Sequence, residues 1–216
     1  LSHENGRRRW VSINAKEAVN DYGESIILIF INDITRQHEA LNASVHDASH
    51  DHLTHLKNRR VAEQQIDQMI HTASRIHQPL ALIVLDLDGF KKVNDTEGHD
   101  AGDKVLIEVA NRLSSLTRKS DIVARWGGDE FLIALNDASQ ETAVRLAQRF
   151  LQRISQPIDI GKDKTANVGA SIGIVICPDN AASFNAAFEC ADVAMYQVKQ
   201  AGKNGIRVYN PQTTTL

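Results

Sequence analysis

Three acidic residues lie where they could hold a metal ion. Asp129 and Glu130 follow two glycines, between short apolar segments that predict a β-hairpin. Gly127 and Gly128 indicate a tight turn, at which a phosphate could approach the backbone closely. Adjacent carboxylates repel each other unless a cation lies between them. A further apolar run upstream ends at Asp86. We therefore expect Asp86 and Asp129 to meet over a metal ion and a nucleotide phosphate.

The order of apolar patterns predicts one α/β (α+β) domain over residues 51–210. Helical spacing indicates helices at 59–75, 101–116, 139–154 and 184–200, the third with Asp137 or Ser139 as N-cap. Apolar runs indicate strands at 80–87, 168–176 and 206–209, and a hairpin at 122–135. The strand at 80–87 should be buried on both faces. A hairpin among such elements predicts a mixed central sheet with helices packed on it.

Composition restricts the class of protein and of partner. The chain has 216 residues, 42% hydrophobic and 24% charged, which is ordinary for a globular protein. A net charge of -3 provides no broad basic surface, so nucleic acid is not an expected partner. No apolar run approaches the roughly 20 residues that cross a bilayer, so we expect no membrane contact within this chain and a cytoplasmic location. Cys177 and Cys190 lack metal-type spacing and should be reduced core residues.

The residues before 51 divide into a strand pair and a linker. Alternation at 10–14 and an apolar run at 25–31 predict two strands, too few to enclose a core. Asn-Asp-Ile-Thr at 32–35 resembles the close of PAS sensor domains, which implies that 1–35 is the C-terminal remnant of one; an unrelated hairpin is the alternative. Residues 36–50 suit a linker helix that could pair with a second copy, and 211–216 form a tail. Metal binding is the less favoured interpretation of four histidines without fixed spacing: His38, His46, His50 and His52.

Five segments in order resemble motifs of the GGDEF-family diguanylate cyclases. They are an opening motif at 51–60, a metal and nucleotide loop at 86–95, a helix start at 98–103, the Gly-Gly-Asp-Glu-Phe signature at 127–131, and a late phosphate motif at 196–204. His55 replaces a usual Gly, and Lys203 replaces a usual Arg. The resemblance covers about residues 50–210. Five ordered motifs are far more specific than the signature alone.

The resemblance implies a palm-like nucleotide cyclase fold and the condensation of two GTP into cyclic di-GMP, with release of pyrophosphate. It implies a homodimer, because one subunit cannot align two GTP molecules, and two Mg²⁺ (or Mn²⁺) ions per active site. Such ions take oxygen ligands and lower the pKa of an attacking hydroxyl. Asp86, Asp129 and Glu130 are the implied catalytic and metal-binding side chains, to which Leu87 would add its carbonyl.

The resemblance also implies how the nucleotide is held. Asn94 and Asp103 would read the guanine edge, because an amide and a carboxylate complement its donors and acceptors. Their structural alternative is to cap a turn and a helix start. Lys203 lacks the bidentate fork of Arg, so GTP affinity should be somewhat weaker than usual. The residues that would contact phosphates are Phe90, Lys91, Gly127, Gly128, Lys199 and Lys203.

Arg118 and Asp121 lie at the spacing of the family's inhibitory product site, which implies that cyclic di-GMP is an inhibitor as well as the product. A surface ion pair is the alternative for these two residues. Two rival functions stay open for the whole domain. One is a catalytically silent GGDEF module that binds GTP or cyclic di-GMP as a receptor, for which His55 and Lys203 leave room. The other is a different palm enzyme, such as another nucleotide cyclase.

Overall fold

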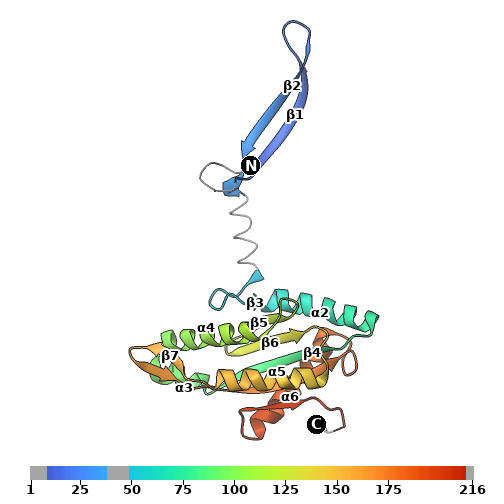
Figure 1. Cartoon of the computed structure of the whole chain (residues 1–216). Coiled ribbons are helices and arrows are strands. Elements are labelled where there is room, and N and C mark those ends of the chain that lie inside the picture. Colours follow the sequence, from blue (N-terminus) through green and yellow to red (C-terminus); the bar gives the residue numbers. More distant parts are fainter. Residues whose placement is uncertain (1–8, 38–48, 213–216) are drawn as a thin grey trace. The chain divides into compact units, whose positions relative to one another are not determined.

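The structure, a computed structural model, describes residues 9–37 and 49–212. The chain divides into two compact units, residues 1–48 and 49–216 (Figure 1). None of the helices within the described ranges is long and apolar enough to span a membrane. The second unit carries every residue to which the sequence assigns chemistry.

The first unit contains an antiparallel hairpin of β1 (Val11–Val19) and β2 (Ser25–Asp33). The predicted strand pair is present, although each strand is longer than the pattern indicates. The side-chain oxygen of Asn20 closes the turn by accepting two backbone N–H groups, at 3.0 and 2.9 Å. Ile27 and Ile29 stay 70% and 62% exposed, so the hairpin buries little apolar surface by itself.

Most of the predicted linker helix at 36–50 lies outside the described residues, because these stop at 37 and resume at 49. His38 and His46 lie outside them as well. The assignment of residues 1–35 to a PAS-like domain, of 36–50 to a linker and of 211–216 to a tail stays a prediction.

The second unit is built on a six-stranded sheet in the order β10-β9-β4-β6-β5-β3. The two outermost pairs are parallel and the inner pairs antiparallel, which confirms the predicted mixed sheet. The strands are β3 (Lys57–Asn58), β4 (Leu80–Asp88), β5 (Ile122–Gly127), β6 (Glu130–Leu135), β9 (Gly169–Cys177) and β10 (Gly205–Val208). A separate short hairpin, which the apolar pattern does not predict, is formed by β7 (Ile158–Gly161) and β8 (Lys164–Ala166).

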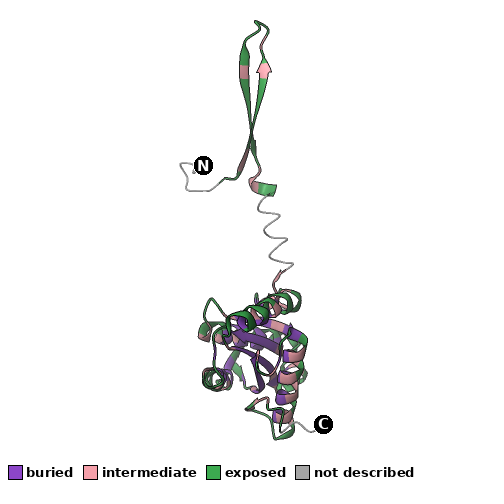
Figure 2. Cartoon of the chain, turned by 90° about the vertical axis from the view of Figure 1, so that its right-hand side faces the viewer, coloured by how far each residue is buried: buried purple, intermediate pink, exposed green. Residues whose placement is uncertain are grey.

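Four long helices pack on the two faces of this sheet, two on each. Alternate residues of β4 enter two separate cores: Ile83 and Leu85 pack with α4 and α5, whereas Leu82 and Val84 pack with α2 and α6. β4 is therefore buried on both faces, as predicted, and the buried residues lie between the layers in Figure 2. The helices are α2 (Arg59–Ile76), α4 (His99–Leu116), α5 (Gln140–Ile154) and α6 (Phe184–Gln200).

One predicted helix boundary needs correction, and one of two predicted N-caps is confirmed. The helix predicted at 101–116 begins at His99, and a further helix, α3 (Phe90–Glu97), precedes it. α3 has a single buried residue, so its apolar pattern is too weak to detect. Ser139 is the N-cap of α5, because its side chain accepts the N–H of Thr142 at 3.3 Å. Asp137 has a left-handed backbone (φ 49°) in the preceding turn.

Both cysteines are free thiols. Cys177 is fully buried, and burial raises the pKa of its thiol to about 12. It therefore stays protonated and unreactive at neutral pH. Cys190 is only half-buried, so the predicted core position is confirmed for Cys177 and in part for Cys190.

Candidate active site

β4 and β6 bring Asp86 and Glu130 side by side as directly paired residues of antiparallel strands. Such residues project from the same face of a sheet, with Cβ atoms roughly 5 Å apart. Asp129 lies in the turn before Glu130, and its carbonyl accepts the N–H of Leu87 at 3.2 Å. Three carboxyl groups, one from the end of β4 and two from the turn and start of β6, therefore gather at one end of the sheet.

The hairpin turn lies one residue later than the glycine pair indicates. Gly127 is the last residue of β5, after an irregularity in the pairing with β6, and the turn consists of Gly128 and Asp129. Gly128 has φ +53°, a conformation that favours glycine. Apart from the residues next to it in the chain, no described atom lies within 4 Å of the place where a Cβ would stand on either glycine. The surface above both residues is open to a ligand.

The carboxylates of Asp86, Asp129 and Glu130 repel one another. Burial raises the pKa of Asp129, and repulsion by Asp86 raises it further. The same two causes raise the pKa of Glu130. Lys199, from the last turn of α6, partly offsets this repulsion because its Nζ lies 2.8 Å from Asp86 Oδ2. Partial burial lowers the pKa of Lys199, but its bond to Asp86 and the surrounding carboxylates outweigh burial and raise it.

The donor chemistry of this cluster fits a hard divalent cation. Mg²⁺ prefers carboxylate and carbonyl oxygens, and a cation would relieve the repulsion that raises the two pKa values. Among the described residues, no three acidic, histidine or cysteine side chains already stand in the geometry of a metal site. The fit therefore rests on the donor set of Asp86, Asp129 and Glu130 and on their electrostatics.

Asp88, the second acid at the end of β4, has a structural role that the sequence does not reveal. Its carboxylate accepts the hydroxyl of Ser171, which is fully buried, at 3.0 and 2.9 Å. It also accepts the backbone N–H of Asn204 at 2.9 Å. Asp88 thereby holds the loop after α6, which carries Lys203 in a left-handed conformation (φ 66°), against the sheet.

The N-terminus of α3 suits a phosphate. Gly89, at φ 86°, is its N-cap, and the first N–H groups of a helix, here at Phe90 and Lys91, lack intrahelical partners. Such a helix end attracts anions. α3 follows directly from the strand that ends in the acid cluster, so the predicted phosphate contacts and metal ligands lie on consecutive elements.

The two residues predicted to read guanine both lie on the α3–α4 helical pair. A Cβ on Gly102 would overlap the side-chain oxygen of Asn94, so the bare backbone of α4 makes room for this amide. Asp103 is exposed one residue further on. Neither residue caps a helix, because the N-caps of α3 and α4 are Gly89 and Gly98, without a side-chain capping bond. The capping alternative is therefore wrong for both residues.

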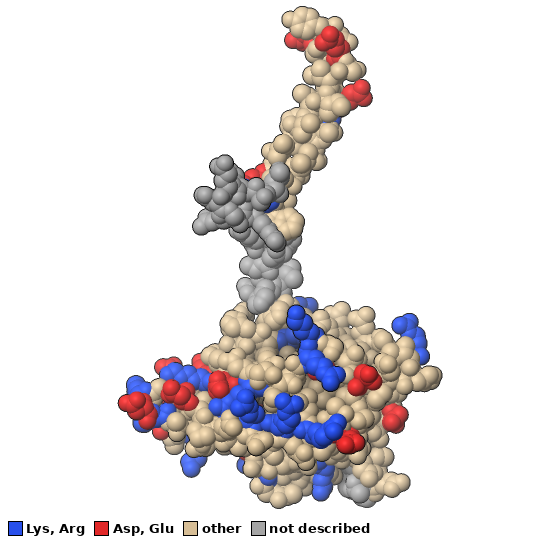
Figure 3. Space-filling model, in the orientation of Figure 1, with Lys and Arg blue, Asp and Glu red and all other residues tan. Residues whose placement is uncertain are grey.

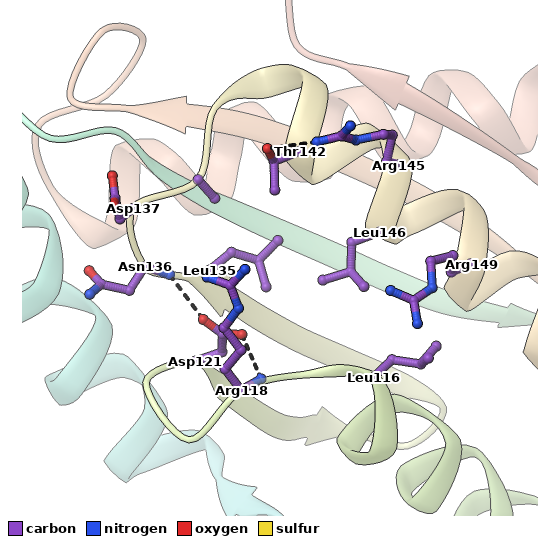
Figure 4. A pocket seen from close by; sticks show the side chains of 11 residues that line it. Leu116, Arg118, Asp121, Leu135, Asn136, Asp137, Thr142, Arg145, Leu146 and Arg149 are labelled. Atoms are coloured by element: carbon purple, nitrogen blue, oxygen red, sulfur yellow. Dashed lines mark hydrogen bonds between the residues drawn. The ribbon is translucent and has the colours of Figure 1, made fainter.

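Arg118 and Asp121 line a cavity of about 300 Å³ (Figure 4). Asp121 accepts the backbone N–H groups of Arg118 and Asn136, at 2.8 and 3.3 Å. Among the described residues no ion pair joins the two side chains, so the surface ion-pair alternative is wrong. Sequence analysis missed two further cations that line the cavity, Arg145 and Arg149, although their spacing of four on α5 puts them on one helix face. Lys and Arg side chains gather on the face of the domain that carries α5 (Figure 3).

The mixed sheet, the acid cluster and the anion-binding helix end define a palm-like nucleotide cyclase domain. A family model described as the diguanylate cyclase GGDEF domain matches residues 48–205. The chain therefore belongs to the GGDEF family of diguanylate cyclases.

Similar proteins of known sequence and structure support this family assignment. The probable diguanylate cyclase DgcE of Escherichia coli is 40% identical over 185 residues, covering 86% of this chain and 17% of that protein. The response regulator PleD of Caulobacter vibrioides is 36% identical over 168 residues, covering 77% and 37%. This chain thus spans less than two fifths of both relatives.

Two solved structures share the fold. The GGDEF domain of TpbB (YfiN) from Pseudomonas aeruginosa matches with a TM-score of 0.72 and 36% identity, covering 74% of this chain and 94% of that one. The coiled coil and GGDEF domain of DgcB from Caulobacter crescentus, in complex with c-di-GMP, matches with a TM-score of 0.75 and 26% identity, covering 81% and 93%.

Proposed function

We propose that residues 49–212 condense two GTP into cyclic di-GMP and two pyrophosphates, working as a homodimer in the cytoplasm, where GTP is available. The observation that carries this proposal is the gathering of Asp86 and Glu130, on paired strands, with Asp129 in the adjoining turn. The strand that carries Asp86 leads directly into the N-terminus of α3. Each subunit would hold one GTP, so two subunits must face each other for reaction.

The chemistry is the attack of the 3′-hydroxyl of one GTP on the α-phosphorus of the other, with pyrophosphate as leaving group, repeated once to close the ring. Two Mg²⁺ or Mn²⁺ ions, when bound, neutralise phosphate charge and favour ionisation of the hydroxyl. Asp86, Asp129, Glu130 and the Leu87 carbonyl would hold them, with Glu130 also placed to polarise the hydroxyl. The backbone at Phe90 and Lys91, the glycine turn, Lys199 and Lys203 would bind phosphates, and Asn94 and Asp103 the guanine.

An assay with purified protein tests this function against the silent-receptor alternative. GTP, but not ATP, should give a product with the mass of cyclic di-GMP in the presence of Mg²⁺ or Mn²⁺. Turnover per subunit should rise with protein concentration, because the reaction needs two subunits. GTP binding without product at any concentration would favour the receptor; the intact acid cluster favours the enzyme. Equal conversion of ATP would favour a different palm enzyme.

We also propose that the cavity beside Arg118 binds cyclic di-GMP as an inhibitor. Arg118, Arg145 and Arg149 offer guanidinium groups that can stack on a base or fork onto a phosphate. The cavity lies at the start of β5, and the catalytic turn follows at the other end of the same strand. Product binding there would limit further turnover.

We further propose that the hairpin at 11–33 closes a PAS-like sensor. β2 is apolar on both faces, yet Ile27 and Ile29 are mostly exposed, a composition typical of a strand that other elements cover. Hydrogen exchange at 26–31 should therefore be fast in this chain and at least tenfold slower in a longer protein that includes the preceding residues. Equally fast exchange in both would contradict the sensor proposal.

A further inference from the structure

Arg125 joins the catalytic turn to a segment far away in the sequence. Its Nε and Nη2 atoms donate to the carbonyl oxygen of Gly128 at 3.0 and 2.9 Å. Its Nη1 atom donates to both carboxylate oxygens of Asp51, 74 residues earlier, at 3.2 Å. The two side chains are only 17% and 24% exposed, so solvent screens this pair less than an ion pair on the surface.

This contact orients the peptide unit between Gly128 and Asp129. A trans peptide is planar, and its C=O and N–H bonds point in opposite directions. Because Arg125 holds the Gly128 carbonyl, the N–H of Asp129 points away from the Arg125 guanidinium. The Asp129 carbonyl is held separately by the N–H of Leu87. The main chain at Asp129 is therefore fixed on both sides.

Asp51 is a firm anchor for Arg125. It begins the turn at 51–56, and its Oδ1 accepts the N–H and the hydroxyl of Thr54 at 2.9 and 2.7 Å. Its own N–H donates to the carbonyl of Leu56 at 2.8 Å. Burial raises the pKa of Asp51, but the bonds from Thr54 and Arg125 outweigh burial and lower it. The carboxylate is therefore charged at neutral pH.

The residues that follow this turn contact the same strand. β3 pairs in parallel with β5, so that Asn58 lies beside Arg125. The guanidinium carbon of Arg59 lies 4.4 Å from the centre of the Trp126 ring, at cation–π distance. Residues 51–59, which come after the predicted linker in sequence, therefore contact β5 up to the residue before the signature.

We propose that Arg125, oriented by Asp51, is a positioning residue that presents the Asp129 N–H and carboxylate to the bound nucleotide. The proposal rests on the proposed cyclase function. A displacement of the turn at 51–56 changes how Arg125 holds the Gly128 carbonyl. The segment after the linker thus adjusts the catalytic turn itself, in addition to any effect on how two subunits meet.

Kinetics of matched variants test the proposal. Asp51→Asn keeps the side-chain shape and removes the charge that orients Arg125; kcat should fall roughly ten- to a hundredfold, with the KM for GTP changed less than threefold. Arg125→Lys should have the same effect, because the single ammonium group of lysine cannot replace the separate nitrogens that contact Gly128 and Asp51. The kcat of the double variant should be no lower than that of the less active single variant, because both substitutions act through one contact. The control is Glu108→Gln, which removes the carboxylate 2.8 Å from Arg112 Nε and should leave kcat within twofold.

Hydrogen exchange tests the same contact without catalysis. Exchange at 127–131 should be at least threefold faster in Asp51→Asn and Arg125→Lys than in the wild type and in Glu108→Gln. Unchanged exchange, or unchanged kcat in an active protein, would overturn the positioning role, as would losses of kcat that multiply in the double variant. A wild type that makes no cyclic di-GMP would instead overturn the proposed function, and exchange would then decide the role of Arg125.

Discussion

Lys199 Nζ lies 2.8 Å from Asp86 Oδ2, which joins the last turn of α6 to the end of β4 inside the acid cluster. The side chains are 30% and 14% exposed, so this ion pair is partly shielded from water. Lys199 therefore supplies the positive charge that three neighbouring carboxyl groups require when no cation is bound.

Replacement of Lys199 by Gln should destabilise the metal-free domain by about 1 kcal/mol at neutral pH. The loss should shrink as the pH falls and the carboxylates become protonated. Urea unfolding at low ionic strength measures it. Lys164→Gln is the control, because Lys164 pairs with Glu97 at the same distance of 2.8 Å but is 59% exposed; its loss should be near zero. Equal losses in both variants would contradict a special role for Lys199.

Asp129→Asn should leave the metal-free domain as stable as wild type, or slightly more stable, near pH 7. The folded-state pKa of Asp129 is raised, so ionisation is harder in the folded than in the unfolded state. Wild-type stability therefore falls as the pH rises from the ordinary Asp pKa through the raised one, and the variant should lose this part of the slope. Thermal melts from pH 3 to 7 would show it.

The same variant should lose several orders of magnitude in turnover, because charge stabilisation supplies several kcal/mol in phosphoryl transfer. Its stabilisation by GTP with Mg²⁺ should shrink as well. Asp129 as a simple turn cap predicts the reverse, a loss of roughly 1 kcal/mol of stability with activity retained. A destabilised but active Asp129→Asn would refute the metal-site assignment.

Asp88→Ala should behave differently from its neighbour in the same motif. It leaves the buried Ser171 hydroxyl and the Asn204 N–H without their acceptor, which should cost about 2–3 kcal/mol of stability. Asp86→Asn should cost far less stability and abolish activity. Denaturant unfolding and the GTP assay separate the two effects. Asp88→Ala with wild-type stability would show that the loop carrying Lys203 is held by other contacts.

Gly102→Ala should displace the Asn94 amide, because the added methyl group overlaps its oxygen. Alanine is a good helix former, so the fold should persist. The KM for GTP should rise roughly tenfold and approach that of Asn94→Ala, since one lost hydrogen bond is worth about 1 kcal/mol or more. Circular dichroism checks the fold. An unchanged KM in both variants would remove Asn94 from the guanine site.

Arg118→Ala should abolish cyclic di-GMP binding in the cavity that Arg118 and Asp121 line. Initial rates of cyclic di-GMP formation should stay near those of the wild type. The backbone N–H that Asp121 accepts is retained in this variant, so the loop should keep its shape. The control is Arg153→Ala, because Arg153 lies on α5, as Arg145 and Arg149 do, but does not line the cavity. Calorimetry with cyclic di-GMP measures binding. A wild type that binds no product at this site would refute the regulatory proposal.

The sequence alone determined the class of the domain and most of its elements. Apolar runs and helical spacing depend on residues close together in the chain, so β4, the hairpin of β5 and β6, and the four long helices could be predicted to within a few residues. The ordered motifs led to the family in the same way. α3 and β7–β8 were missed, because short elements with few buried residues leave little periodic signal.

The tertiary structure alone decided which charged groups meet. Asp51 with Arg125, Lys199 with Asp86, and Asp88 with Ser171 are pairs of residues far apart in the chain. Their contacts depend on strand register and on how α6 packs against the sheet, and no local pattern carries that information. Asp86 and Asp88 show the consequence: they lie two positions apart on β4 and so point to the same face of the sheet. Asp86 forms the last pair of β4 with β6, opposite Glu130, whereas Asp88 lies beyond this pair and accepts bonds from Ser171 and Asn204. One joins the acid cluster, and the other holds a loop.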